Sequence, residues 1–181
     1  MVHNIKDSLN VERSQFERQD NFYRHLFGHE PNRLDYEVYP DAQRDDIDLT
    51  ITNREGKQLT ISEKYRPVDY GDILFEIWSV YPNKHGWGMD SKADILTYWT
   101  PFRLFVIDMP SVVTLFNRNR VSEKISLING VMEDNVLELD GVTYNIKVIR
   151  ALNKTYSSLS VAIDTQNLTQ MGIRYGLIPL V

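Results

Sequence analysis

Three successive strand-like segments constrain the fold of this chain more than any other feature. Residues 46–52 and 58–66 alternate between apolar and polar side chains, and a turn containing Gly56 joins them. Residues 72–80 follow a second turn and are apolar enough for a strand in the centre of a sheet. Each segment also carries charged side chains. We therefore expect neighbouring strands of one sheet, with carboxylates and a lysine gathered at its edge.

The remaining elements lie on both sides of these strands in the sequence. No repeat or linker interrupts residues 1–181, so we expect a single domain. The order of elements predicts an α/β fold with a central mixed β-sheet flanked by helices and a C-terminal β-hairpin. Periodicity and turn residues predict helices over 8–27, 92–99 and 112–119, strands over 34–39, 103–109 and 159–163, a hairpin over 136–148, and a helical turn starting at 164–165.

Composition excludes several classes of protein. The chain has 181 residues, of which 42% are hydrophobic, enough for a sizeable core. Its net charge of −5 means that DNA binding would depend on a local basic patch or on metal ions that bridge phosphates and carboxylates. Without cysteine there is no disulfide and no thiolate nucleophile. No long apolar stretch and no signal peptide are visible, so we expect a cytoplasmic protein without membrane contact.

The charged side chains of the three strands suggest a metal centre. Side chains alternate along a strand, so Asp48, Lys64 and Glu76 would converge if their strands were neighbours. Glu63 would point to the opposite face unless a bulge intervened. Mg²⁺ prefers carboxylate oxygens and water as ligands, and a nearby lysine can orient the water and add positive charge. This set of residues fits the hydrolysis of phosphodiester bonds.

The alternative interpretation is the solvated face of a half-buried sheet, because acids and lysines commonly alternate on such a face. Glu76 argues against it. This glutamate lies between Phe75 and Ile77 in a segment that otherwise has a buried pattern, and buried carboxylates are rare without a partner.

The three strands also resemble the core of the PD-(D/E)XK nuclease superfamily, and small phage and mobile-element members most of all. The resemblance extends over roughly residues 10–120 and implies a restriction-endonuclease-like core. It implies Asp48 as the first metal ligand and Lys64 as the motif lysine, with Glu17 on the preceding helix as a further acid. The matching segments are Asp46-Ile47-Asp48-Leu49, Ile61-Ser62-Glu63-Lys64-Tyr65-Arg66, Asp72-Ile73-Leu74-Phe75-Glu76-Ile77-Trp78-Ser79 and the later Gly86-Trp87 with Ala93-Asp94-Ile95-Leu96-Thr97-Tyr98.

One position departs from the family pattern. The acid expected two residues before the lysine is Ser62 here. Either Glu76 supplies the missing carboxylate as a metal ligand, or a bulge turns Glu63 toward the metal. A third interpretation is a nuclease fold that has lost its activity.

The resemblance therefore implies one of two functions. The first is a DNA endonuclease or exonuclease that depends on Mg²⁺ or Mn²⁺. The second is a catalytically inactive accessory factor of a phage or mobile element, which binds nucleic acid or a protein partner. Arg66, Trp87 and Glu17 are candidate substrate contacts, although a loop tryptophan commonly packs on its own domain. The sequence leaves open whether the protein is a homodimer.

Overall fold

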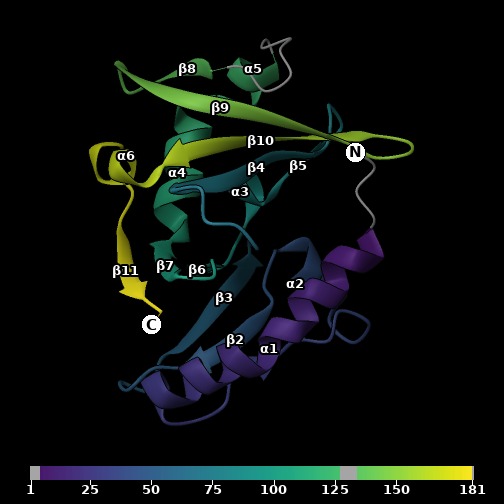
Figure 1. Cartoon of the computed structure of the whole chain (residues 1–181), viewed down its shortest axis with the longest axis vertical. Coiled ribbons are helices and arrows are strands. Elements are labelled where there is room, and N and C mark those ends of the chain that lie inside the picture. Colours follow the sequence, from purple (N-terminus) through teal and green to yellow (C-terminus); the bar gives the residue numbers. More distant parts are fainter. Residues whose placement is uncertain (1–4, 127–133, 181) are drawn as a thin grey trace.

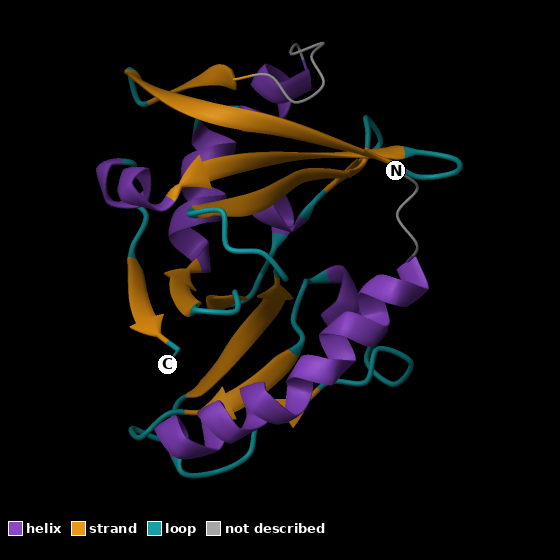
Figure 2. Ribbon diagram, viewed as in Figure 1, coloured by secondary structure: helices purple, strands orange, loops and turns teal. Residues whose placement is uncertain are grey.

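The computed structural model describes residues 5–126 and 134–180. Within them, eleven strands form two sheets, and helices pack against both (Figures 1 and 2). The α/β class with a mixed sheet and flanking helices is confirmed, but two sheets replace the single central sheet that we expected. The helices are α1 (Ile5–Phe27), α2 (Pro40–Arg44), α3 (Trp87–Asp90), α4 (Met109–Arg118), α5 (Val121–Ser126) and α6 (Thr165–Gln170).

The first sheet is mixed and has the strand order β1-β2-β3-β6-β7-β11. Strands β3 and β6 run parallel, and the other neighbours are antiparallel. A parallel pair requires a long crossover, which the chain makes by building part of the second sheet between β3 and β6. The strands are β1 (Asn32–Arg33), β2 (Leu49–Thr52), β3 (Gln58–Tyr65), β6 (Ile95–Trp99), β7 (Arg103–Asp108) and β11 (Tyr175–Pro179).

The second sheet is antiparallel, in the order β5-β4-β10-β9-β8. The predicted C-terminal hairpin is its β8–β9 pair, which turns at Asp140 and Gly141. Both turn residues have positive φ, 50° and 81°, as a two-residue turn of type I′ requires. The strands are β4 (Asp72–Val80), β5 (Lys84–His85), β8 (Asp134–Leu139), β9 (Val142–Leu152) and β10 (Ser157–Asp164).

Helix α1 covers one face of the first sheet. Its Tyr23 is 1% exposed and packs at the edge of the Trp99 ring, with 6.2 Å between the ring centroids. Phe22 packs on the same ring at 5.3 Å. The buried partners of this small core are Leu49, Ile51, Ile61 and Leu104. No helix of the described residues is long and apolar enough to cross a membrane.

The larger core lies between the two sheets, where α4 buries its apolar face (Figure 1). Phe116 of α4 is fully buried and contacts Phe75 of β4 edge to face, 5.4 Å between centroids. Leu96 and Phe105 face the same core from the first sheet. The apolar stripe of α4 and the alternation of the strands thus meet in one packed layer.

Two predicted elements were wrong. Residues 92–99 were expected to form a helix, but Ile95–Trp99 is the central strand β6. Both of its faces are covered, by α1 and by the larger core, so its sequence shows no clear alternation. Residues 34–39 were expected to form a strand but form turns, in which the Asp35 carbonyl accepts hydrogen bonds from the Val38 and Tyr39 amides.

Candidate functional site

Two acids enter the site on the segment between α2 and β2. Asp46 adopts a left-handed backbone conformation, with φ of 57°, which aspartate tolerates better than most residues. The Ile47 amide donates to the Ala42 carbonyl at 2.8 Å, and the Asp48 amide donates to the Ile61 carbonyl at 2.9 Å. These bonds fasten the segment to α2 and to β3. The backbone therefore holds both carboxylates at one end of the β2–β3 pair.

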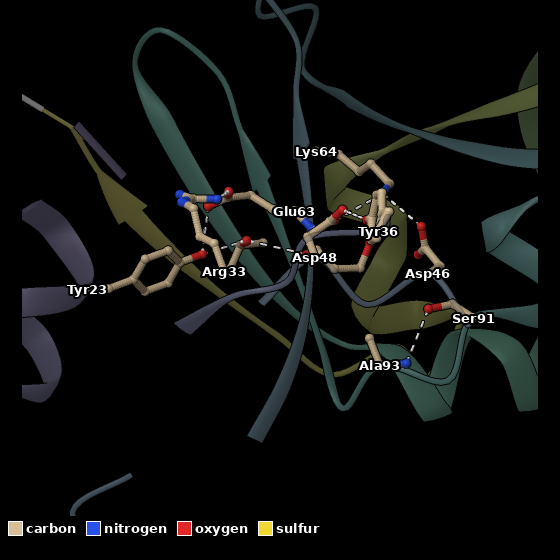
Figure 3. A network of polar contacts seen from close by, with 11 residues as sticks. Tyr23, Arg33, Tyr36, Asp46, Asp48, Glu63, Lys64, Ser91 and Ala93 are labelled. Carbon is tan, nitrogen blue, oxygen red and sulfur yellow. Dashed lines mark hydrogen bonds and ion pairs between the residues drawn. The ribbon is translucent and has the colours of Figure 1, made fainter. Parts of the chain in front are cut away.

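Lys64 of β3 lies between these two acids (Figure 3). Its Nζ is 2.8 Å from Asp46 Oδ1 and 3.4 Å from Asp48 Oδ2. All three side chains are about one fifth to one quarter exposed. Burial alone would lower the pKa of Lys64, but the charges of Asp48 and Asp46 outweigh it and raise that pKa above the ordinary value. The ammonium is therefore held charged.

Asp48 has further partners. Its Oδ1 accepts a hydrogen bond from the Tyr36 hydroxyl, and its Oδ2 accepts one from the Glu63 amide at 2.6 Å. Burial, followed by the charge of Asp48, raises the pKa of Tyr36, so its phenol remains a donor at neutral pH. Both oxygens of Asp48 are thus oriented by neighbours before any ligand arrives.

One carboxylate oxygen of Asp46, unlike those of Asp48, lacks a hydrogen-bond partner within the described residues. This atom, Oδ2, is buried. A buried carboxylate oxygen without a hydrogen-bond partner is costly, and it is an appropriate ligand for a cation. Asp46 thereby joins the candidate site, which the sequence assigned to Asp48 and not to this neighbour.

Glu76 reaches the cluster from β4, which belongs to the other sheet. The expectation that its strand lies beside β3 was therefore wrong, because β3 pairs with β2 and β6. The charges of Lys64 and Asp46 nevertheless influence the pKa of its carboxyl group. Burial raises the pKa of Glu76, Lys64 lowers it, and Asp46 raises it. Packing of the two sheets against each other, and not strand pairing, brings this acid near Lys64.

Trp87 and Arg66 have different surroundings. The Trp87 ring lies against Phe75, with 5.6 Å between centroids, and its own centroid is 5.8 Å from Lys64 Nζ. Trp87 therefore forms part of the wall beside the lysine. Arg66 instead forms an ion pair with Asp72 and lies over the Tyr70 ring at 4.4 Å.

Glu63 points to the α1 side of the sheet, away from Lys64 (Figure 3). The bulge that would have turned it toward the metal is absent from the described strands, since β3 pairs with β2 and β6 without a shift of register. The Glu63 side chain is 5% exposed, accepts a bond from Tyr23 at 3.0 Å and pairs with Arg33 at 2.7 Å. Burial raises its pKa, although Arg33 and Tyr23 lower it.

A pocket of about 530 Å³ lies between α1 and the segment that follows β1. It reaches from Glu63 to Asp48, and so borders the candidate site. Its wall contains Gln19, which is 2% exposed and whose side-chain oxygen lacks a hydrogen-bond partner within the described part of the chain. Glu17 of the same helix is exposed and does not line the pocket. The lining is Phe16, Gln19, Arg33, Leu34, Asp35, Tyr36, Glu37, Asp48, Glu63 and Tyr65.

The oxygen ligands of this site are of the type that binds a divalent cation, but they do not form a complete ligand set. Asp46 and Asp48 present hard oxygen ligands, and Glu76 is a third acid nearby. In the described regions, no group of three or more acids or histidines is close enough to form a complete ligand set. The Lys64 ammonium lies where the two aspartates meet, so cation binding would have to compete with it.

Comparison with known proteins gives no assignment. No family model, no curated protein and no solved structure matches this chain. The function is therefore inferred from the geometry of the site.

Gly86 provides a test of how tightly the site is packed. A Cβ atom at this position would lie 2.5 Å from both the Cγ and the carbonyl oxygen of Glu76. Because the second contact is with backbone, β4 or the loop must move. We expect Gly86→Ala to lower the free energy of unfolding by about 2–3 kcal/mol.

The matched control is Gly176→Ala, where a Cβ meets nothing within 4 Å. It should change stability by less than about 0.5 kcal/mol. Chemical denaturation of the three proteins measures both effects. Equal stability of Gly86→Ala and the unchanged protein would contradict the close approach of the loop to β4.

Proposed function

We propose that this protein is a metal-dependent nuclease that hydrolyses phosphodiester bonds in DNA as an endonuclease or an exonuclease. The observation that carries the proposal is the Lys64 ammonium held by Asp46 and Asp48 at one end of β2 and β3. Glu76 of the other sheet is a further acid, whose pKa is raised by burial, lowered by the charge of Lys64 and raised by that of Asp46. Two acids, a third acid nearby and a charged lysine suit hydrolysis at a phosphate better than acyl transfer, which needs a nucleophile beside a base.

The proposed roles follow from the contacts. Asp46 and Asp48 would hold Mg²⁺ or Mn²⁺ with water as further ligands, and Glu76 would be a third acid near them. The bound ion would supply charge neutralisation at the phosphate and a more acidic water. Lys64 would place positive charge beside the scissile phosphate once the acids no longer require it. Tyr36 and the Glu63 amide would keep Asp48 oriented.

The arrangement of strands is compatible with a restriction-endonuclease-like core, which is the finer form of the fold that we propose. The antiparallel pair β2–β3 lies beside the parallel strand β6, and α1 covers one face. An acid before β2 and a lysine near the end of β3 come together because these two strands pair. This is the arrangement that the resemblance to PD-(D/E)XK nucleases implies.

The second candidate function is a non-catalytic nuclease-fold protein that binds nucleic acid or a protein partner. One observation favours it. Ser62 is fully buried, and its hydroxyl finds no hydrogen-bond partner in the described segments, so no acid is available at the position where the family pattern has one.

Cleavage assays distinguish these functions. Plasmid, single-stranded and branched DNA are incubated with the protein in Mg²⁺ or Mn²⁺, and the products are separated on gels. We expect metal-dependent cutting that Asp46→Asn and Asp48→Asn each reduce by a factor of about 100 or more. Asp41→Asn is the control. Asp41 is exposed, and among the described residues its only ion pair is with Arg44. Absence of cutting, or cutting by folded Asp48→Asn, would contradict the nuclease proposal.

A further inference from the structure

The pocket beside Asp48 has an unusual combination of walls. Phe16, Tyr36 and Tyr65 contribute aromatic rings, and the Arg33 guanidinium lies 4.1 Å above the Phe16 ring. Gln19 adds a buried side-chain oxygen that lacks a hydrogen-bond partner among residues 5–126 and 134–180. A buried acceptor without a donor is costly, so the amide of Gln19 suits a ligand that brings an N–H group.

The charge of the pocket restricts which part of a ligand can enter. Four carboxylates line it against the single guanidinium of Arg33. A phosphate group would be repelled, whereas a planar group with N–H donors would stack on the rings and donate to the acceptors. The four carboxylates are those of Asp35, Glu37, Asp48 and Glu63.

We propose that this pocket binds one unpaired nucleobase of the DNA substrate, next to the phosphate at Asp46 and Asp48. The proposal rests on the nuclease function proposed above and adds the class of substrate. A base can enter such a pocket only when its hydrogen-bonding edge and its faces are free, because in duplex DNA the base is stacked and paired. The protein should therefore select single-stranded DNA, or a branch or end where a base is unpaired.

Asp48 connects the two parts of the proposal. It lines the pocket, and it also contacts Lys64 in the candidate metal site. A nucleotide with its base in the pocket therefore has its phosphate on the side of Asp46 and Lys64. The carboxylates of the pocket would exclude the phosphate from it, and a cation held by Asp46 and Asp48 would supply the positive charge for that phosphate.

Binding experiments without divalent metal test this inference apart from cleavage. Fluorescence anisotropy compares a labelled single-stranded oligonucleotide, its duplex, and a series of single strands with one abasic residue at each position in turn. We expect the single strand to bind at least tenfold more tightly than the duplex. We expect one abasic position to weaken binding by about tenfold, since stacking and the Gln19 contact are lost together.

The variant Gln19→Leu keeps the size of the buried side chain and removes its acceptor. It should weaken binding of the intact strand and reduce the effect of the abasic position, because the stacking contribution remains, while the exposed Gln58→Leu serves as the control. Thermal unfolding verifies that both variants fold, and the abasic series on the unchanged protein needs no variant.

The outcomes of these experiments separate the pocket assignment from the nuclease function. Equal binding of duplex and single strand, or indifference to every abasic residue, would overturn the pocket assignment even if the protein cuts DNA. Displacement of the single strand by spermidine at low concentration, with no abasic effect, would show that the acidic pocket takes cations and would also overturn it. Base-dependent binding by a protein that cuts nothing would support the pocket and contradict only the nuclease function.

Discussion

Replacement of Lys64 by methionine is expected to slow cleavage strongly and at the same time to tighten metal binding. The ammonium is the group that neutralises Asp46 and Asp48 in this structure. Without it, two adjacent carboxylates attract a divalent cation with one fewer competing charge, so we expect a 10- to 100-fold lower dissociation constant for Mg²⁺. The phosphate then lacks the lysine charge, and cleavage should fall by a factor of about 100–1,000.

Titration calorimetry and a gel assay measure the two effects of Lys64→Met. Mg²⁺ should also raise the melting temperature of the variant more than that of the unchanged protein, because tighter binding to the folded state stabilises it more. Lys57→Met is the matched control, since Lys57 is exposed in the turn before β3. Weaker Mg²⁺ binding by Lys64→Met than by the unchanged protein would show that the aspartates are not the metal ligands.

Local patterns predicted those parts of the fold in which one face of an element is buried. The hairpin at Asp140 and the helix up to Phe27 follow from turn chemistry and apolar spacing. Strand β6 could not be recognised because Leu96 faces the larger core and Trp99 faces α1. Periodicity vanishes when both faces are covered, and only the packed sheets reveal the strand.

The candidate site likewise has a part that the sequence predicts and a part that it does not. The proximity of Asp48 and Lys64 follows from the pairing of two strands that are adjacent in sequence. The position of Glu76 depends on how one sheet packs against the other, which no local pattern contains. The sequence does contain a sign of Gln19, because its spacing of three residues after Phe16 and four before Tyr23 places this polar residue on the buried stripe of α1. A polar residue on such a stripe indicates a pocket or a buried partner.

The largest effect on stability is expected from Arg33→Met. Arg33 is the cation that pairs with Glu63, whose side chain is 5% exposed. Removing it leaves a buried carboxylate with only the Tyr23 hydroxyl as a side-chain partner among the described residues. Such a change costs about 3–5 kcal/mol. For a chain of this length the melting temperature should fall by roughly 10 °C, which calorimetry measures.

The dependence on pH identifies the cause of this loss. Burial already raises the pKa of Glu63 above its ordinary value of 4.5, and the loss of the Arg33 charge should raise it further. A group whose pKa is raised on folding loses stabilising free energy as pH rises from its unfolded value through its folded value. The deficit of Arg33→Met should therefore be largest at pH 7–8 and shrink as pH falls toward 5. Asp69, whose pKa its hydrogen bond to Arg103 lowers to about 2, stays charged throughout this range in both proteins.

The double variant Arg33→Met with Glu63→Gln separates charge from packing. Glutamine has nearly the shape of glutamate and no charge. The double variant therefore lacks the contact of Arg33 with Phe16, as Arg33→Met does, but it has no buried anion. Its deficit relative to Glu63→Gln should be smaller than that of Arg33→Met alone and constant between pH 5 and 8. A deficit of Arg33→Met that stays constant between pH 5 and 8 would show that Glu63 is already neutral in the unchanged protein, and that its ion pair with Arg33 does not stabilise the fold.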